Sequence, residues 1–128
     1  MTKNEKDPYQ WIEKAEHDLI AAENLIAVRP LILDIACFHC QQAVEKFLKA
    51  YLIYKKQTVI KTHNLDILLK KCSGFDNDFK NIDVKNMEDF AIRARYPHDS
   101  IIPSTKETKE YFQIATGIKE LILKKIKL

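Results

Sequence analysis

The sequence predicts an all-α fold, and three observations support this prediction. Only two glycines and four prolines occur in 128 residues, which leaves little turn chemistry for a many-stranded sheet. Alanine, leucine, isoleucine, lysine and glutamate dominate, as they do in helical proteins. Apolar residues recur at alternating steps of three and four along most of the chain. Because the connections are short, we expect one domain over residues 1–128, built as an antiparallel up-down bundle of four long helices and one short helix.

The first two predicted helices carry the longest apolar stripes. The first runs from about Pro8 to Val28, after a polar segment 1–7 that we expect to be flexible. Its stripe consists of Ile12, Ala15, Leu19, Ala22 and Ile26. The second runs from about Leu31 to Lys56, and its stripe is wide enough to contact more than one neighbour. That stripe consists of Leu33, Ala36, Cys37, Cys40, Ala43, Val44, Phe47, Leu48, Ala50, Tyr51 and Tyr54. We therefore expect this helix to lie at the centre.

Three further helices follow. Thr62 is positioned to cap a short helix that Gly74 ends. The inward residues of this helix are Leu65, Leu68, Leu69 and Cys72. A fourth helix has an apolar side that comprises Val84, Met87, Phe90, Ala91 and Ala94. The last begins at a capping box of Ser104 and Glu107 and runs nearly to the end. Its stripe comprises Tyr111, Ile114, Ala115, Ile118, Leu121 and Ile122, with Gly117 as a mild weakness.

Charge and hydropathy narrow the function classes. A net charge of +3 is small beside 21 basic and 18 acidic residues, so bulk charge alone does not indicate a nucleic-acid partner. The start of the chain has no apolar core of a signal peptide, and the richest apolar run, residues 31–33, is broken at once by Asp34. We expect a cytoplasmic protein without a membrane span.

The three cysteines are expected to be reduced, buried thiols. Cys37 and Cys40 have the C-x2-C spacing of a metal or redox site, but both belong to the apolar stripe. A structural zinc needs four ligands, and Cys72 is the only further cysteine. We therefore expect no disulfide, no metal and no cofactor.

The stretch around Pro97 carries the main candidate for chemistry. Pro97 disfavours helical dihedrals in Tyr96, so the helix that contains Arg93 should stop there and leave His98 in the following turn. Arg93 offers a bidentate partner for a phosphate, and His98 can exchange a proton near neutral pH. Together they form an R-x4-H pattern. In the alternative, Arg93 pairs with Asp89 and His98 has no chemical role.

Other polar residues have weaker claims. Gln41, Gln42, Glu45, Lys46 and Lys49 follow the polar side of the central helix, where they either face a ligand or form ordinary pairs such as Glu45 with Lys49. His17 is expected on the surface, among Glu16 and Asp18. His63 is expected to cap a first turn or to pack against the bundle.

Four landmarks in order resemble a HEPN domain: WIEKAEHDL at 11–19, FHCQQAVEKFLKA at 38–50, THNL at 62–65 and ARYP at 94–97. The resemblance covers nearly the whole chain, from about Tyr9 to the last helix. It implies a small helical bundle that dimerises, occurs usually in bacteria or archaea, and is often encoded beside a minimal nucleotidyltransferase as toxin and antitoxin. Active members cut RNA without metal through R-x4-6-H at the dimer cleft, and this motif falls on Arg93 and His98.

The chemistry of RNA cleavage is compatible with this resemblance. A ribose 2′-hydroxyl must lose a proton, the leaving 5′-oxygen must gain one, and charge on the phosphoryl oxygens must be neutralised. The proposed site has one histidine per chain, His98, which is too few for a separate acid and base. A two-fold dimer would bring two copies of it together. The leading hypothesis is therefore a homodimeric endoribonuclease.

Two departures from the family pattern define the alternatives. Toxin-like members often have an adenylylated tyrosine two residues after the histidine, where this chain has Ser100, and a polar residue after the arginine, where it has Ala94. Many relatives with Arg-Tyr-Pro lack the histidine and are nucleotide-binding or partner-binding modules. The second hypothesis is such a module, with Arg93, Arg95 and Tyr96 as contacts and Gln42, Lys46 and Lys49 as further RNA or nucleotide ligands. A third is a structural interaction protein.

Overall fold

The computed structural model describes residues 6–58, 61–93, 96–97 and 102–127. Within these residues the protein has five α-helices and a single-turn 3-10 helix, which confirms the all-α prediction. The elements, in chain order, are α1 (Pro8–Ala27), α2 (Leu33–Tyr54), α3 (Leu65–Ser73), η2 (Asn77–Phe79), α4 (Met87–Arg93) and α5 (Thr105–Lys125).

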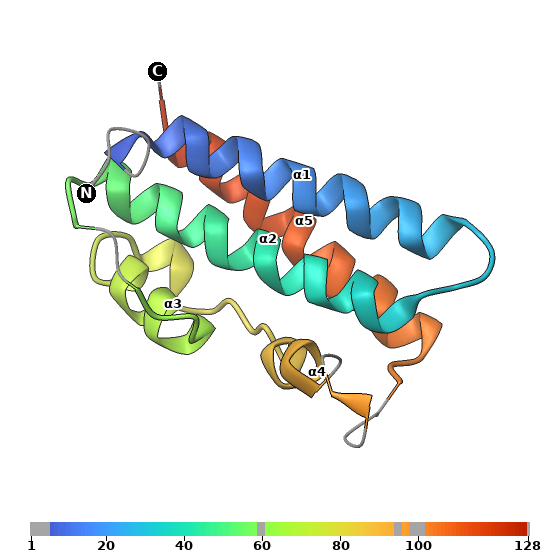
Figure 1. Cartoon of the computed structure of the whole chain (residues 1–128). Coiled ribbons are helices and arrows are strands. Elements are labelled where there is room, and N and C mark those ends of the chain that lie inside the picture. The colour runs from blue at the N-terminus through green and yellow to red at the C-terminus, as the bar shows by residue number, and fades with distance from the viewer. Residues whose placement is uncertain (1–5, 59–60, 94–95, 98–101, 128) are drawn as a thin grey trace.

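Helix α2 lies at the centre of the bundle, as expected. It packs against α1, α3, α4 and α5. Figure 1 shows α1, α2 and α5 as three long helices side by side, with α3 and α4 covering the opposite side of α2. Helices α3 and α4 return the chain to the end of the bundle at which α2 begins, and α5 starts there. Helix α1 therefore packs antiparallel to both α2 and α5 (Figure 1). In the described part of the chain, no helix is long and apolar enough to cross a membrane.

The start of α1 is fixed by local chemistry. The side chain of Asp7 accepts a hydrogen bond from the Tyr9 backbone N–H at 2.9 Å, and Pro8 occupies the first turn. Of the segment 1–7 that the sequence predicts to be flexible, residues 1–5 lie outside the described residues, whereas Asp7 is the helix cap. The predicted stripe is buried except at Ile26, which is half-buried.

The predicted stripe of α2 is buried, including Val44, Leu48 and Tyr51, except at Tyr54, which is partly buried. Two nested backbone hydrogen bonds end this helix, as in a Schellman motif. The Gln57 N–H donates to the Leu52 carbonyl at 3.0 Å, and the Lys56 N–H donates to the Ile53 carbonyl at 2.9 Å. Lys56 has a φ of 65°, in the left-handed region that such a cap requires.

The short helix α3 buries Leu65, Leu68, Leu69 and Cys72, as predicted. Its cap was predicted at Thr62, and this is wrong: the cap is Asn64, whose side chain accepts from the Ile67 N–H at 3.0 Å. Thr62 instead stabilises the turn before the helix, where its hydroxyl accepts a hydrogen bond from the Asn64 N–H at 3.1 Å. The helix ends at Gly74 as expected.

The fourth helix is shorter than the sequence predicts. In the described residues, α4 covers only Met87–Arg93, so the bundle has three long helices rather than four. Val84 is buried but precedes the helix, because Lys85 has a left-handed φ of 53°. Ala94, which was assigned to the same apolar side, lies outside the described residues.

Helix α5 begins at the predicted capping box. The Ser104 hydroxyl accepts from the Glu107 N–H at 3.0 Å, and the Glu107 carboxylate accepts from the Ser104 N–H at 2.9 Å. Gly117 lies in the middle of α5, and a Cβ atom placed there would meet no atom within 4 Å.

All three cysteines are buried with free thiols, as the stripe assignment predicts. Burial raises the pKa of Cys37 to about 11 and the pKa values of Cys40 and Cys72 to about 12. The Cys37 sulfur lies 3.5 Å from the Thr108 hydroxyl. Among the described residues, no three His, Cys, Asp or Glu side chains are grouped to hold a metal ion.

Candidate functional site

Arg93 is the last residue of α4, where a positive side chain complements the partial negative charge of a helix end. Its guanidinium lies 3.5 Å from the Asp89 carboxylate one turn earlier, and the two side chains are 36% and 66% exposed. This is the local ion pair that the sequence offers as an alternative role. Exposed pairs at this spacing contribute only about 0.3–0.5 kcal/mol, so Asp89 holds Arg93 weakly.

The residues beyond Arg93 are described only in part. The Tyr96 backbone N–H donates to the Arg93 carbonyl at 3.2 Å, and the Tyr96 side chain is half exposed. Arg95 and His98, together with Ala94 and Ser100, lie outside the described residues. The convergence of His98 and Arg93 therefore stays a prediction.

Glu45 and Lys49 do not lie on an exposed polar face. Their side chains are 5% and 6% exposed, and the Lys49 ammonium donates to the Glu45 carboxylate at 3.1 Å. The predicted pair is confirmed, but as a buried pair. Lys49 also lies 5.6 Å from the ring centroid of Trp11.

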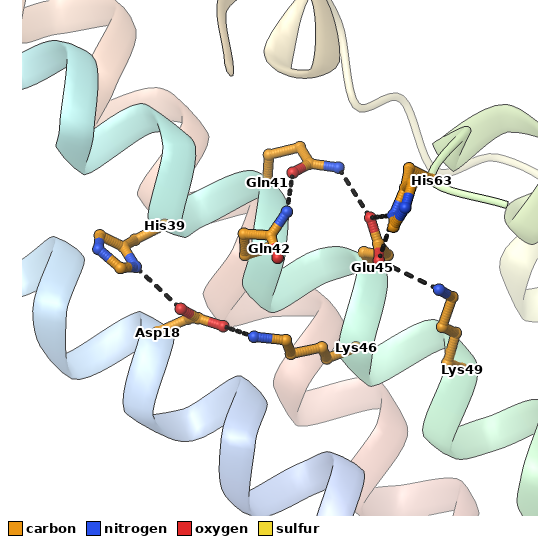
Figure 2. A network of polar contacts seen from close by, with 8 residues as sticks. All are labelled: Asp18, His39, Gln41, Gln42, Glu45, Lys46, Lys49 and His63. Atoms are coloured by element: carbon orange, nitrogen blue, oxygen red, sulfur yellow. Dashed lines mark hydrogen bonds and ion pairs between the residues drawn. The ribbon is translucent and has the colours of Figure 1, made fainter. Parts of the chain in front are cut away.

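Two further side chains, Gln41 and His63, donate to Glu45, and Gln42 extends this chain of contacts through Gln41 (Figure 2). The Gln42 amide donates to the Gln41 carbonyl at 2.8 Å, and the Gln41 amide donates to Glu45 at 3.2 Å. The Nδ1 atom of His63 lies 3.1 and 3.0 Å from the two carboxylate oxygens of Glu45. Because a carboxylate only accepts, Nδ1 carries the proton in this contact. His63 thus binds the bundle through its side chain, while most of the ring stays exposed.

A second polar cluster joins α1 to α2. Asp18 accepts from His39 at 2.8 Å and from the Lys46 ammonium at 2.6 Å (Figure 2). The sequence places Asp18 on the polar side of α1 with His17, and this is wrong for Asp18, which is buried because it faces α2. His17 is exposed, as predicted. The charge of Lys46, like that of Lys49, is therefore already matched inside the protein.

A pocket of about 280 Å³ opens between α2, the start of α3 and α4. Its lining consists of Phe38, Gln41, Gln42, His63, Glu88, Ala91 and Ile92. Burial raises the pKa of Glu88, and a hydrogen bond from the Leu65 backbone N–H opposes this shift. The pocket thus combines an aromatic ring, aliphatic side chains and four polar groups, and its α4 residues lie one to five positions before Arg93.

Reasoning from the sequence missed this pocket. It named Gln41 and Gln42 but gave no role to Glu88 or Phe38, and it assigned His63 to helix capping or packing. One signal was present: apolar residues occupy nearly every side of the central helix, so polar residues on it, such as Glu45, have to be buried and paired.

Comparisons with known proteins give one match. The family model described as HEPN domain matches residues 9–126, which is nearly the whole chain. Neither the curated proteins nor the solved structures compared with the chain gave a match.

Proposed function

The chain belongs to the HEPN domain family, which supports a nuclease or nucleotide-binding function in general, and from this premise we propose that it is an endoribonuclease that cuts RNA at Arg93 and His98. The active species would be a homodimer, because HEPN domains commonly dimerise. The reaction would use no metal and no cofactor.

The observation that carries the proposal is the state of Arg93. The guanidinium sits at the end of a helix, about a third exposed, and is held by one carboxylate at 3.5 Å. Breaking such a pair costs well under 1 kcal/mol, whereas a bidentate contact to a phosphate is charge-assisted at both oxygens. Arg93 can therefore exchange Asp89 for the RNA backbone.

The proposed reaction transfers two protons. His98 of one protomer takes the proton of the ribose 2′-hydroxyl, whose oxygen forms a bond to the adjacent phosphorus while the bond from phosphorus to the 5′-oxygen breaks. His98 of the partner subunit gives a proton to that leaving oxygen, and the Arg93 guanidiniums neutralise the phosphoryl charge. The products are a 2′,3′-cyclic phosphate and a 5′-hydroxyl. Because the nucleophile is internal to the RNA, this route needs no metal-bound water.

Exposed apolar surface beside Arg93 supports a dimer contact at this place. Ile92, in the last turn of α4, and Tyr96, three residues after the helix, are 55% and 50% exposed. The broad apolar face of the central helix is covered by the other helices of the same chain, so it does not supply this contact.

The test is RNA cleavage in EDTA. Wild-type protein should nick single-stranded RNA, leave DNA intact and produce 2′,3′-cyclic ends. His98→Ala should reduce the rate by about 10²–10⁴-fold, and Arg93→Ala by a similar or greater factor. His17→Ala is the matched control, because His17 is an exposed histidine without an assigned role. Cleavage that is absent in the wild type, or equal in all four proteins, would refute the nuclease.

The contact between Arg93 and Asp89 also favours a second candidate, a non-catalytic module that binds RNA or a nucleotide. In this case, Arg93, with Arg95 and Tyr96, holds the phosphate, and His98 has no chemical role. Asp89→Asn should then raise affinity for a nucleoside monophosphate, because it removes the carboxylate that competes for Arg93. The module is supported if Arg93→Ala abolishes binding while neither the wild type nor His98→Ala cuts RNA.

A minimal nucleotidyltransferase is the proposed protein partner, on the basis of the family resemblance. Ser100 stands where toxin-like members have the tyrosine that is adenylylated, so we expect the partner to act by binding rather than by this modification. Co-purification with a nucleotidyltransferase encoded by the neighbouring gene, with no added nucleotide on the chain by mass spectrometry, would support this arrangement. Adenylylation of the chain would contradict it.

A further inference from the structure

The pocket between α2, α4 and the segment before α3 has a volume that suits one small aromatic group. Its volume of about 280 Å³ is close to the lower end of the range for small-molecule sites, roughly 300–1,000 Å³. Phe38 on α2 and Ala91 and Ile92 on α4 supply apolar surface for a ring face. Stacking on such side chains is the usual way in which proteins hold single-stranded bases.

The polar groups of the pocket are oriented as acceptors. The chain of amides starts at the Glu45 carboxylate, which only accepts, so Gln41 must donate to it and Gln42 must donate to Gln41. This order directs the Gln42 carbonyl oxygen away from Gln41 (Figure 2). His63 donates its Nδ1 proton to the same carboxylate.

Glu88 adds a carboxylate to the pocket. Burial and the like charges of Asp66 and Glu45 raise its pKa, while the hydrogen bond from the Leu65 N–H and the nearby His63 lower it. A carboxylate has room for about four donors, so Glu88 can accept from a ligand as well as from Leu65. A matching ligand therefore presents several adjacent N–H groups and a planar aromatic face.

Among the four RNA bases, guanine fits this description best. Its N1–H and exocyclic amino group lie side by side on one edge and can donate to the two oxygens of one carboxylate. Adenine and cytosine offer only an exocyclic amino group beside an acceptor, and uracil offers one N–H between two acceptors. We propose that the pocket binds a guanine base of single-stranded RNA, with Glu88 accepting from its N1–H and amino group and Phe38 against its face.

This inference builds on the proposed function and adds the base next to the phosphate that Arg93 would hold. Glu88 and Arg93 both lie on α4, about 7.5 Å apart along the helix axis and about 140° apart around it, so a base in the pocket and a phosphate at Arg93 can belong to one short segment of RNA that passes around the end of the helix. A nuclease of this kind would cut beside guanosine. A binding module with the same pocket would prefer guanosine nucleotides.

The test measures binding of GMP, AMP, CMP and UMP to the full chain by calorimetry at fixed salt, without RNA. The wild type should bind GMP most tightly. Glu88→Gln should weaken GMP by about 5- to 150-fold, the range that corresponds to ~1–3 kcal/mol for a bidentate base contact. The same variant should strengthen AMP, because a carboxamide offers the acceptor and donor that the adenine edge requires. Glu110→Gln, the same change at an exposed carboxylate outside the pocket, should leave all four affinities unchanged.

The outcomes separate the base from the phosphate and from the chemistry. Arg93→Ala should weaken all four nucleotides equally, since it removes a phosphate contact only. Equal binding of the four nucleotides by the wild type, or an equal loss of all four in Glu88→Gln, would overturn the guanine pocket. If Glu88→Gln does not fold, Gln42→Ala should still lower the ratio of GMP to AMP affinity. Guanine preference without RNA cleavage would keep the pocket and refute the nuclease, whereas cleavage without base preference would do the reverse.

Discussion

Replacing Lys49 by methionine should destabilise the fold far more than the sequence suggests. Lys49 and Glu45 look like an ordinary pair on a helix surface, but both side chains are about 95% buried. Methionine keeps most of the aliphatic volume and removes the ammonium. The Glu45 carboxylate then stays in the interior without its charged partner.

The expected loss follows from what remains around Glu45. Removing one partner of a buried ion pair usually costs about 3–5 kcal/mol. Gln41 at 3.2 Å and His63 at 3.0 Å still donate to the carboxylate, so we expect about 3 kcal/mol, near the lower limit. Domains of this size are stable by only about 5–15 kcal/mol, so the loss is a large share of the total.

Equilibrium urea unfolding followed by circular dichroism measures this loss. At a slope of about 1–3 kcal/mol/M, the midpoint should fall by roughly 1–3 M. Arg93→Met is the matched control, because Arg93 and Asp89 have the same i,i+4 spacing on an exposed surface, and it should cost less than about 0.5 kcal/mol. The double variant Glu45→Gln, Lys49→Met should recover most of the loss, since it removes both charges.

Two results would refute this reasoning. One is a cost below about 1 kcal/mol for Lys49→Met, similar to that of the exposed control. The other is a double variant whose cost equals the sum of the two single changes, because independent side chains would then explain the data. In either case, the Glu45 carboxylate would not depend on Lys49 for its charge balance.

Four further predictions concern the rest of the fold. The native thiols of Cys37, Cys40 and Cys72 should resist a thiol reagent at pH 8 until the chain unfolds, because pKa values of about 11 or higher leave about one thiolate in a thousand; rapid modification would contradict their burial. Gly117→Ala should raise stability by about 0.5–1 kcal/mol and Tm by a few degrees, since a methyl group there meets nothing; a lower Tm in calorimetry would refute this. Lys56→Gly should also stabilise, by roughly 0.5–1 kcal/mol, because glycine accepts the left-handed φ of the α2 cap at no steric cost; an unchanged or lower urea midpoint would argue against strain. Sedimentation at tens of micromolar should show a dimer, and a monomer would remove the proposed composite site.

The sequence predicts the buried core well, because helical periodicity reports which side of a helix is apolar. The stripes of α1, α2 and α3 are buried almost residue for residue, and the Ser104 capping box has the expected hydrogen bonds. These features depend on neighbours three or four residues apart. Local spacing is therefore sufficient to find them.

The parts that were missed depend on contacts between distant segments. His63 meets Glu45 from 18 residues away, and Asp18 meets Lys46 from 28 residues away. The first contact requires the segment before α3 to pack on α2, and the second requires α1 to pack on α2. Periodicity assigns a polar residue to a polar side, but it does not say whether solvent or another helix covers that side.

Two i,i+4 ion pairs, Glu45 with Lys49 and Asp89 with Arg93, show how burial changes the cost of binding a ligand. To reach a phosphate, Lys49 would have to leave a buried carboxylate, at a cost of about 3 kcal/mol or more by the argument above. Arg93 would leave only an exposed carboxylate 3.5 Å away, at well under 1 kcal/mol. The sequence proposes both cations as phosphate or RNA ligands, but only Arg93 can be recruited by RNA at low cost. Lys49 instead holds Glu45 in place, and Glu45 in turn holds Gln41 and His63 at the wall of the pocket.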